Sequence, residues 1–314
     1  MRRAKELLRD LCAGVISRVF LRCCPSLVNR VYNALPHSWL AYLVGHGFFG
    51  RPSRHFPWRI KLANGRFLRL EVDPATRFDV AFAFDYKVHD VGLKRVQEHL
   101  VERMSDRSVY LDIGANIGVS SIYALSCGRT CWLFEPNVTL HPFVKKLFAL
   151  NGYTAARLES VALSSSAGEA EFYLSRSSYL SSFDPAHAAT EGDVTRVKVP
   201  LRPLDSFLPE LKPCAQEIVV KIDVEGHEMS VLEGAVETLR HYRPPVMLEL
   251  LRNREARAAA FQFMRSHGYD CWGIVNAPVL QTVPLPSLAE LVAFDAINFL
   301  FRPSAASGSP AGRP

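Results

Sequence analysis

A short glycine-containing segment is the clearest chemical signal in the sequence. Asp112, Gly114, Ala115, Asn116 and Gly118 follow the apolar run VYLDI and precede a stretch of helical composition. Glycine lets the backbone approach a ligand closely, and the free amides at the start of a helix favour an anion. We therefore expect a small anionic group to bind at this loop.

The spacing of these glycines differs from the dinucleotide fingerprint. A G-x-G-x-x-G turn would need glycines at the positions of Asn116 and Val119. The observed D-x-G-x-x-x-G spacing favours a smaller anion, such as the carboxylate of an amino acid. S-adenosylmethionine carries such a carboxylate.

A second acidic residue follows the next predicted strand. Glu135 ends the run CWLFE about twenty residues after the loop, where a carboxylate can accept hydrogen bonds from both ribose hydroxyls. Pro136 then turns the chain out of the strand. The ligand is therefore expected to contain an adenosine-type ribose.

Apolar strands alternate with helical stretches from residue 109 onward, which predicts βαβ units and a mostly parallel sheet. The expected strands are 109–113, 131–135, 194–201, 217–223, 245–250, 269–275 and 294–301, with a strand pair over 157–174, and the expected helices are 116–126, 138–151, 228–240 and 255–266. Asp112, Glu135, Asp223 and Glu249 each lie at or near the carboxyl end of a strand. Open α/β sheets bind ligands along that edge, so these four carboxylates should gather at the site.

Three side chains after the run EIVVKID are candidates for catalysis. Asp223 is the first choice, and Glu225 follows as a base or a substrate-orienting group. His227 titrates near neutral pH, although a single histidine in such a loop is more often structural. Glu228 is expected to interact with the positive end of the next helix. The spacing of the three candidates matches no strong metal motif, so no metal is predicted.

Composition narrows the class of protein and its compartment. The chain of 314 residues is 48% hydrophobic and has a net charge of +6, without a dense basic stripe that would indicate a nucleic-acid partner. Its seven cysteines are odd in number and form no CxxC pair. This pattern argues against a disulfide framework or a zinc site and favours the reducing cytoplasm.

The N-terminal region differs from the rest of the chain. Residues 1–60 are expected to form a basic helical extension, either packed on the main domain or in peripheral contact with a membrane. Within it, the uncharged stretch 31–50 is predicted to be a lid helix rather than a membrane span. A hairpin is predicted over 60–72, with Asn64-Gly65 as its turn. The main domain would cover 61–302, followed by a disordered tail over 303–314.

Five segments, in this order and spacing, resemble the FkbM family of methyltransferases: YLDIGANIGVSS, FEPN, VALSSSAGEAEFY, KIDVEGHEMSVLEGA and PPVMLEL. The resemblance covers about 109–250, and KIDVEGHE is its most distinctive part. It implies a Rossmann-like class I methyltransferase fold, with a mostly parallel seven-stranded sheet and helices on both faces. It also implies S-adenosyl-L-methionine as the methyl donor, and a hydroxyl of a glycan, glycolipid or small natural product as the acceptor.

The resemblance assigns the cofactor site residue by residue. Four positions of the glycine loop would line the methionine part: Asp112, Gly114, Asn116 and Gly118. Glu135 would hold the ribose, Ala162 would border the adenine, and Asp223 would lie near the transferable methyl. Ala115 and Pro136 complete the predicted cofactor site as neighbours in the same two turns.

Two other functions stay open at this point. A nicotinamide-dependent oxidoreductase or epimerase could use a similar sheet, although the missing glycines and the absence of a Tyr-x-x-x-Lys pair argue against it. A catalytically inactive Rossmann-like binding module is the other alternative, and the intact set of loop glycines and strand-end carboxylates argues against that. Nothing in the sequence indicates an oligomeric state.

Overall fold

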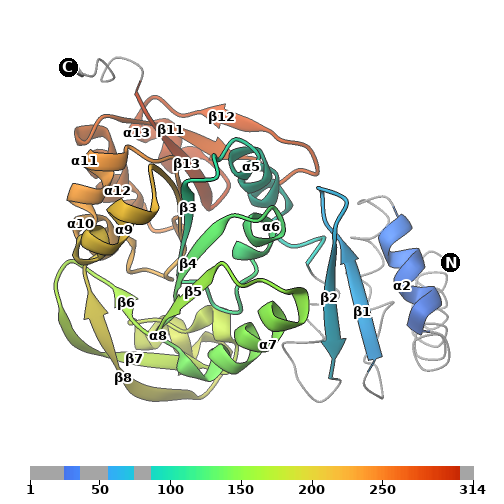
Figure 1. Ribbon diagram of the computed structural model, residues 1–314. Helices are drawn as coiled ribbons and strands as arrows, with labels where there is room; N and C mark the ends of the chain where they lie inside the picture. The colour runs from blue at the N-terminus through green and yellow to red at the C-terminus, as the bar shows by residue number, and fades with distance from the viewer. Residues whose placement is uncertain (1–24, 36–55, 74–85, 305–314) are drawn as a thin grey trace, which may run out of the picture. The chain divides into compact units, whose positions relative to one another are not determined.

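The computed structural model describes residues 25–35, 56–73 and 86–304 (Figure 1). Two compact units are present: Met1–Val91 with Lys146–Gly152, and Gly92–Lys145 with Tyr153–Pro314. Most of the predicted N-terminal extension, including most of the predicted lid helix, and the tail beyond residue 304 lie outside the described residues. The predicted domain boundaries stay predictions. Among the described residues, no helix is long and apolar enough to cross a membrane.

The first unit contains the predicted hairpin. Strands β1 (Phe56–Lys61) and β2 (Phe67–Val72) pair antiparallel, and each alternates buried with exposed residues. The turn contains Gly65 at φ +79°, a conformation that favours glycine. Helix α2 (Pro25–Ala34) belongs to the same unit, and the Asn33 side chain joins it to β1: Nδ2 donates to the Arg59 carbonyl at 2.7 Å. The hairpin prediction is confirmed, with a first strand that begins at Phe56.

The second unit is built on a sheet with the order β12-β11-β13-β10-β9-β3-β4-β5. The strands are β3 (Ser108–Ile113), β4 (Thr130–Phe134), β5 (Ala156–Glu159), β9 (Glu217–Ile222), β10 (Val246–Glu249), β11 (Tyr269–Ile274), β12 (Thr282–Pro284) and β13 (Asn298–Pro303). Strands β10, β9, β3, β4 and β5 run parallel, whereas β13, β11 and β12 add on antiparallel. The described sheet therefore has eight strands rather than the expected seven, because the short strand β12 pairs on the outside of β11.

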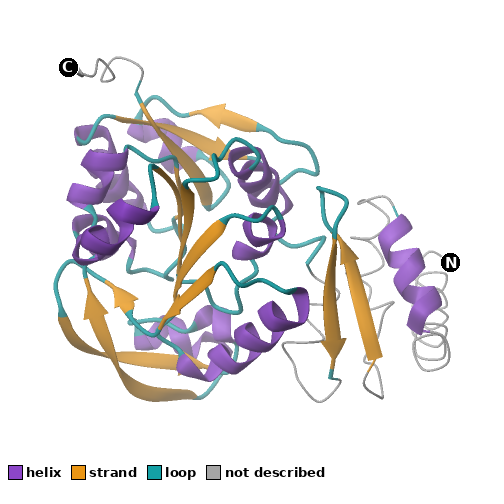
Figure 2. Ribbon diagram, in the orientation of Figure 1, coloured by secondary structure: helices purple, strands orange, loops and turns teal. Residues whose placement is uncertain are grey.

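Helices cover both faces of this sheet (Figure 2). The helices of this unit are α5 (Val91–Val101), α6 (Ser121–Ser126), α9 (Leu208–Cys214), α10 (Glu228–Glu233), α11 (Val236–Tyr242), α12 (Arg254–Ser266) and α13 (Leu288–Ala293). Helix α7 (His141–Asn151) begins in this unit, and its part from Lys146 onward belongs to the first unit. Every residue of the central strand β3 is buried, as expected for a parallel strand covered on both faces. The Rossmann-like fold expected from the sequence is therefore present.

Two predicted helices differ in the structure. The helix expected over 116–126 begins only at Ser121, because Asn116 and Gly118 have positive φ angles of 49° and 78° that a helix excludes. The helix expected over 228–240 is divided into α10 and α11 at Gly234. A Cβ atom at Gly234 would lie 2.0 Å from the Ser164 carbonyl oxygen, so close backbone packing requires glycine there.

The strand pair expected over 157–174 is wrong. Strand β5 joins the main sheet beside β4, whereas β6 (Ala162–Leu163), β7 (Gly168–Ser175) and β8 (Val194–Arg202) form a separate three-stranded sheet. In that small sheet β7 pairs antiparallel with β8, and β6 pairs parallel with β8. Between β7 and β8 the chain forms short helices, including α8 (Pro185–Ala188), and this segment reaches the site.

Candidate active site

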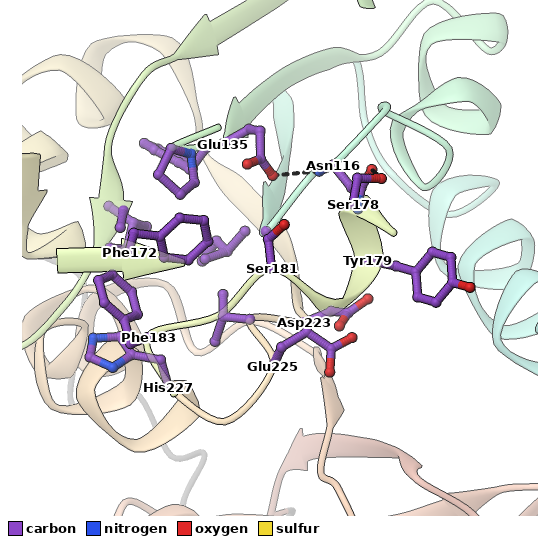
Figure 3. Close-up of a pocket in the computed structure, with 17 residues that line it drawn as sticks. Asn116, Glu135, Phe172, Ser178, Tyr179, Ser181, Phe183, Asp223, Glu225 and His227 are labelled. Atoms are coloured by element: carbon purple, nitrogen blue, oxygen red, sulfur yellow. Dashed lines mark hydrogen bonds between the residues drawn. The ribbon is translucent and has the colours of Figure 1, made fainter. Parts of the chain in front are cut away.

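A cleft lies at the carboxyl ends of β3, β4 and β9, with about 590 Å³ of open space (Figure 3). The lining includes eight of the residues predicted from the sequence: Gly114, Asn116, Glu135, Pro136, Ala162, Asp223, Glu225 and His227. The parallel strands therefore bring the glycine loop, Glu135 and Asp223 to one edge of the main sheet.

The glycine loop crosses closely over the end of β9. Gly114 has φ +76°, and a Cβ atom there would lie 1.8 Å from the Asp223 carbonyl oxygen. The amides of Gly114 and Ala115 donate to the Phe134 carbonyl at 3.0 and 3.1 Å. Only glycine at position 114 allows this crossing, so its role in this structure is to bring the loop and Asp223 together.

Asp112, Ala115 and Gly118 do not line the cleft. The Asp112 side chain is fully buried, and its Oδ2 accepts a hydrogen bond from Ser121 Oγ at 2.7 Å. Ala115 is buried, and Gly118 donates its amide to the Ala115 carbonyl at 2.8 Å. These three residues therefore stabilise the conformation of the loop, whereas Gly114 and Asn116 line the cleft.

Glu135 is a buried carboxyl group that holds the loop. Its Oε2 accepts from the Asn116 amide and its Oε1 from the Asn137 amide, both at 2.7 Å. Burial raises the pKa of Glu135 to about 7, although both amides and Lys221 favour the ionised form. Each carboxylate oxygen can accept more than one hydrogen bond, so Glu135 can hold the loop and still accept from a ribose hydroxyl.

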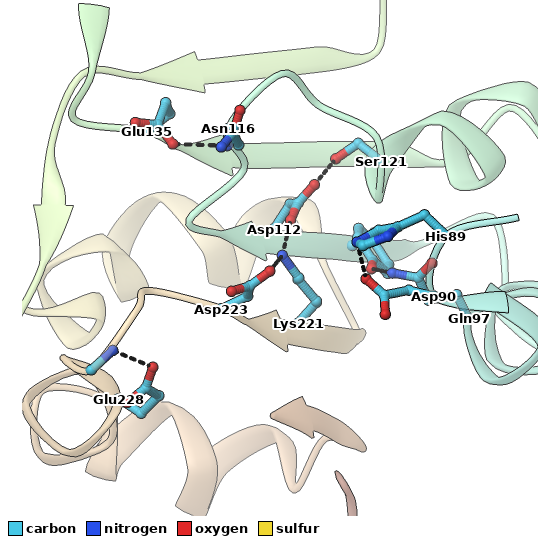
Figure 4. A network of polar contacts seen from close by, with 12 residues as sticks. His89, Asp90, Gln97, Asp112, Asn116, Ser121, Glu135, Lys221, Asp223 and Glu228 are labelled. Carbon is cyan, nitrogen blue, oxygen red and sulfur yellow. Dashed lines mark hydrogen bonds and ion pairs between the residues drawn. The ribbon is translucent and has the colours of Figure 1, made fainter. Parts of the chain in front are cut away.

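Lys221 is a buried cation that the sequence did not mark as functional. Its Nζ lies 2.9 Å from Asp223 Oδ2 and 3.8 Å from Asp112 Oδ1 (Figure 4). Burial alone would lower the pKa of Lys221, but Asp223 and Asp112 outweigh it and raise the pKa. Burial raises the pKa of Asp112. The ammonium group thus neutralises part of the charge that the strand-end carboxylates bring together.

The three predicted catalytic residues separate into two places. Asp223 and Glu225 point to the side of the cleft where Tyr179 lies, whereas His227 lies beside Phe183 and Phe172 (Figure 3). His227 Nε2 lies 3.0 Å from Ser164 Oγ, and its ring centroid lies 4.4 Å from that of Phe183. Burial lowers the pKa of His227. His227 is therefore engaged in packing at the apolar end of the cleft.

Glu225 lies at the polar end with an unusual backbone. Its φ angle is +52°, and its carbonyl accepts a hydrogen bond from Ser182 Oγ at 2.7 Å. Burial, together with the nearby acids Asp223 and Glu228, raises the pKa of Glu225 to about 8, although Lys221 acts in the opposite direction. Glu228 itself accepts from the Gly226 amide at 2.9 Å at the start of α10, which is the structural role expected for it.

Residues between β7 and β8 complete the cleft. They are Ser178, Tyr179, Ser181 and Phe183, joined by Phe172 of β7. Ser178 Oγ donates to Asn116 Oδ1 at 3.0 Å, so this segment contacts the glycine loop directly. The serine-rich composition of 177–182 was the only sequence signal for this part of the site, and it does not specify which side chains reach the cleft.

Three carboxylates at this edge lie close together. Oxygen atoms of Asp223, Glu225 and Glu249 are all within 4.8 Å of one another, a spacing that a cation could bridge. Lys221 already forms an ion pair with Asp223. Because acidic groups often gather without an ion, we assign no metal to them, and the prediction of a metal-free site stays a prediction.

The strand order and the glycine loop at the end of β3 define a Rossmann-like domain with a ligand site at the carboxyl edge of its sheet. A family model for the methyltransferase FkbM domain matches residues 112–271, slightly more than half of the chain. The chain therefore belongs to the FkbM methyltransferase family. A comparison with curated proteins found no significant match.

Among solved structures, the chain is similar to methyltransferase FkbM from Methylobacillus flagellatus. The identity is 16% and the TM-score 0.42, over 64% of this chain and 44% of that one. The chain thus spans less than half the length of that protein. It is also similar to an S-adenosylmethionine-dependent O-methyltransferase from Thermotoga maritima, with 8% identity and a TM-score of 0.39 over 79% and 77% of the two chains.

Proposed function

We propose that this protein transfers a methyl group from S-adenosylmethionine to a hydroxyl group of a glycan, glycolipid or natural-product acceptor. The observation that carries the proposal is the composition of one cleft. The cleft combines the loop at Gly114 and Asn116 with Glu135, a carboxylate placed to accept from ribose hydroxyls. It also contains the acidic pair Asp223 and Glu225. Membership of a methyltransferase family supports the same reaction class.

The residues of the cleft match the three chemical parts of the cofactor. Asn116, at the glycine loop, lines the part of the cleft that suits the amino-acid part, and Glu135 can accept from the ribose hydroxyls. Ala162, Leu163, Phe172 and Phe183 give an apolar end for the adenine. Acidic side chains at the other end suit a positively charged sulfur. The nicotinamide part of a dinucleotide has no comparable match in the glycine spacing.

Bound S-adenosylmethionine would supply a methyl group on a positively charged sulfur. The chain would then align the acceptor oxygen with that carbon and exclude water, which can supply several kcal/mol of the barrier reduction. Asp223, held by Lys221 at 2.9 Å, would orient the reacting groups without being free to move. Glu225 would face the acceptor hydroxyl as its base.

Isothermal titration of the purified protein with S-adenosylmethionine, S-adenosylhomocysteine and NAD tests the cofactor. We expect micromolar binding of both adenosyl ligands and none of NAD. Glu135→Gln should weaken both adenosyl ligands by about tenfold or more, because a hydrogen bond to a charged group is worth about 1.5–3 kcal/mol. The exposed Glu233 provides a matched control, and Glu233→Gln should bind like the wild type.

The outcomes separate the open alternatives. Binding of NAD alone would favour a nicotinamide-dependent enzyme, and binding of no nucleotide would favour an inactive module. If the adenosyl ligands bind, mass spectrometry of hydroxyl-bearing glycans, glycolipids and natural products after incubation with the protein should reveal a gain of one methyl group. Products methylated only at nitrogen would contradict the proposed O-methyl transfer.

A further inference from the structure

His187 lies next to the proposed base, although no sequence motif marks it. It belongs to the short helix α8, and its Nε2 lies 3.1 Å from Glu225 Oε2. The two side chains are largely buried, with 22% and 17% of their surfaces exposed. The contact joins the segment between β7 and β8 to the turn after β9. It therefore exists only because the fold places these two segments side by side.

Ser182 and Asp184 hold the two halves of this contact in place. Ser182 Oγ donates to the Glu225 carbonyl at 2.7 Å and accepts from the Asp184 amide at 3.0 Å. Asp184 in turn caps α8, where its Oδ1 accepts from the Ala186 amide at 2.8 Å. One serine thus connects the backbone of Glu225 to the start of the helix that carries His187.

Two acids and one cation lie near Glu225. Glu225 faces the acids Asp223 and Glu228, and the nearby ammonium of Lys221 is already paired with Asp223. Burial raises the pKa of Glu225 to about 8, so this carboxyl takes up a proton near neutral pH. The buried His187 Nε2 makes no hydrogen bond of good geometry to the described residues, and Glu225 Oε2 lies 3.1 Å from it. Glu225 is therefore the acidic side chain that this nitrogen faces.

We propose that His187 is a positioning residue that forms, with Glu225, the dyad that accepts the proton of the acceptor hydroxyl. This inference rests on the proposed methyl transfer. Glu225 lines the cleft and would contact the acceptor, whereas His187 is not part of the cleft lining and contacts Glu225 Oε2. His187 acts by holding the carboxylate in its orientation and by passing the proton toward solvent.

The proton and the electrons balance in this step. The acceptor O–H bond breaks and its proton moves to a Glu225 oxygen, while an electron pair of the acceptor oxygen forms the new bond to the methyl carbon. The carbon–sulfur bond breaks at the same time, and its electron pair stays on sulfur to give a neutral thioether. The proton then leaves Glu225 through His187, which restores the base for the next cycle.

The titration of Glu225 tests the dyad without knowledge of the acceptor. The full-length protein is labelled with ¹³C at glutamate side chains, and the Glu225 signal is assigned by its loss in Glu225→Gln. Because an imidazole 3.1 Å from Oε2 would stabilise the carboxylate, His187→Gln should raise the Glu225 midpoint by about one pH unit. His241 is exposed on α11, so His241→Gln should leave the midpoint unchanged.

Two ligands then test whether the dyad faces the methyl position. S-adenosylmethionine carries a positive sulfur and should lower the Glu225 midpoint, whereas neutral S-adenosylhomocysteine should lower it much less. An unchanged midpoint in His187→Gln would overturn the dyad. Equal shifts of the Glu225 midpoint with both bound ligands would show that the dyad does not lie beside the methyl group. The proposed function would stand in that case. If neither ligand binds, the proposed function and the dyad's catalytic role fail together.

Discussion

The two ends of the cleft have side chains of different chemical character, charged at one end and aromatic at the other. The polar end has Asp223, Glu225 and the buried cation Lys221. The apolar end has Phe172, Phe183 and His227, with ring centroids 5.0 Å apart for the first pair and 4.4 Å for the second. The contrast places charge where a sulfonium and an acceptor would react, and flat apolar surface where a base would stack. Two histidines show the same contrast: His187 contacts Glu225 of the polar end, whereas His227 contacts Phe183 of the apolar end.

The largest expected effect is a loss of folding stability on removal of Lys221, the cation of the polar end. Lys221→Met would leave Asp112 and Asp223 without their shared partner, and breaking a buried ion pair costs about 3–5 kcal/mol. Chemical denaturation at pH 7 should show this loss. Lowering the pH should recover part of it, because the buried Asp112, whose pKa is already raised, then becomes neutral. Lys212→Met on the exposed side of α9 is the matched control, and an equal loss there would contradict the role of Lys221.

The next largest expected effect is a loss of affinity for adenosine-containing ligands when the apolar end is changed. Phe183→Ala removes a ring that lines the cleft where the adenine is proposed to bind, and an aromatic pair contributes about 0.5–1.5 kcal/mol beyond its buried area. Calorimetry should show S-adenosylmethionine, S-adenosylhomocysteine and adenosine losing affinity by a similar factor of about ten. A loss confined to S-adenosylmethionine would mean that Phe183 contacts the sulfonium end, and the comparison of the two ends would be wrong.

A pH effect should distinguish the polar end from the ribose site. The pKa of Glu225 is raised to about 8, so the carboxyl is mostly protonated at pH 6 and ionises as the pH rises. Only the ionised form attracts a sulfonium, so affinity for S-adenosylmethionine should increase up to about tenfold between pH 6 and pH 8. The pKa of Glu135 is raised to about 7, but its titration should change the affinities for both adenosyl ligands equally, because both contain the same ribose.

The difference between the two ligands therefore isolates Glu225. Affinity for S-adenosylhomocysteine should change much less over the same range, and Glu225→Gln should make the two pH profiles similar. A steep profile for S-adenosylmethionine that persists in Glu225→Gln would assign the titration to another group.

The smallest expected change in cofactor affinity is for substitution of His227. His227→Phe keeps a ring beside Phe183 and loses the contact with Ser164 Oγ, so cofactor affinity should change by about threefold or less. Methyl transfer to an identified acceptor should persist in this variant. Complete loss of transfer with normal cofactor affinity would restore His227 as a catalytic base.

Local patterns predicted much of the main sheet and the edge that carries the site. Asp112, Glu135, Asp223 and Glu249 could be placed together because each ends an apolar strand, and parallel strands end at a common edge. Helix boundaries were less accurate. The start of α6 depends on the positive φ of Asn116, and the break after α10 depends on Gly234 packing against a distant backbone carbonyl. Long-range contacts of this kind leave no periodic signal.

The sequence alone determined the alternation of strands and helices, the glycine loop and the four strand-end carboxylates, since these follow from local hydrophobic periodicity and backbone stereochemistry. Only the tertiary structure decided that β7 pairs with β8, that Phe183 meets His227, and that His187 meets Glu225. Those contacts join segments far apart in the chain. They depend on how the small sheet and the segment between β7 and β8 pack over the cleft, which the composition of that segment does not specify.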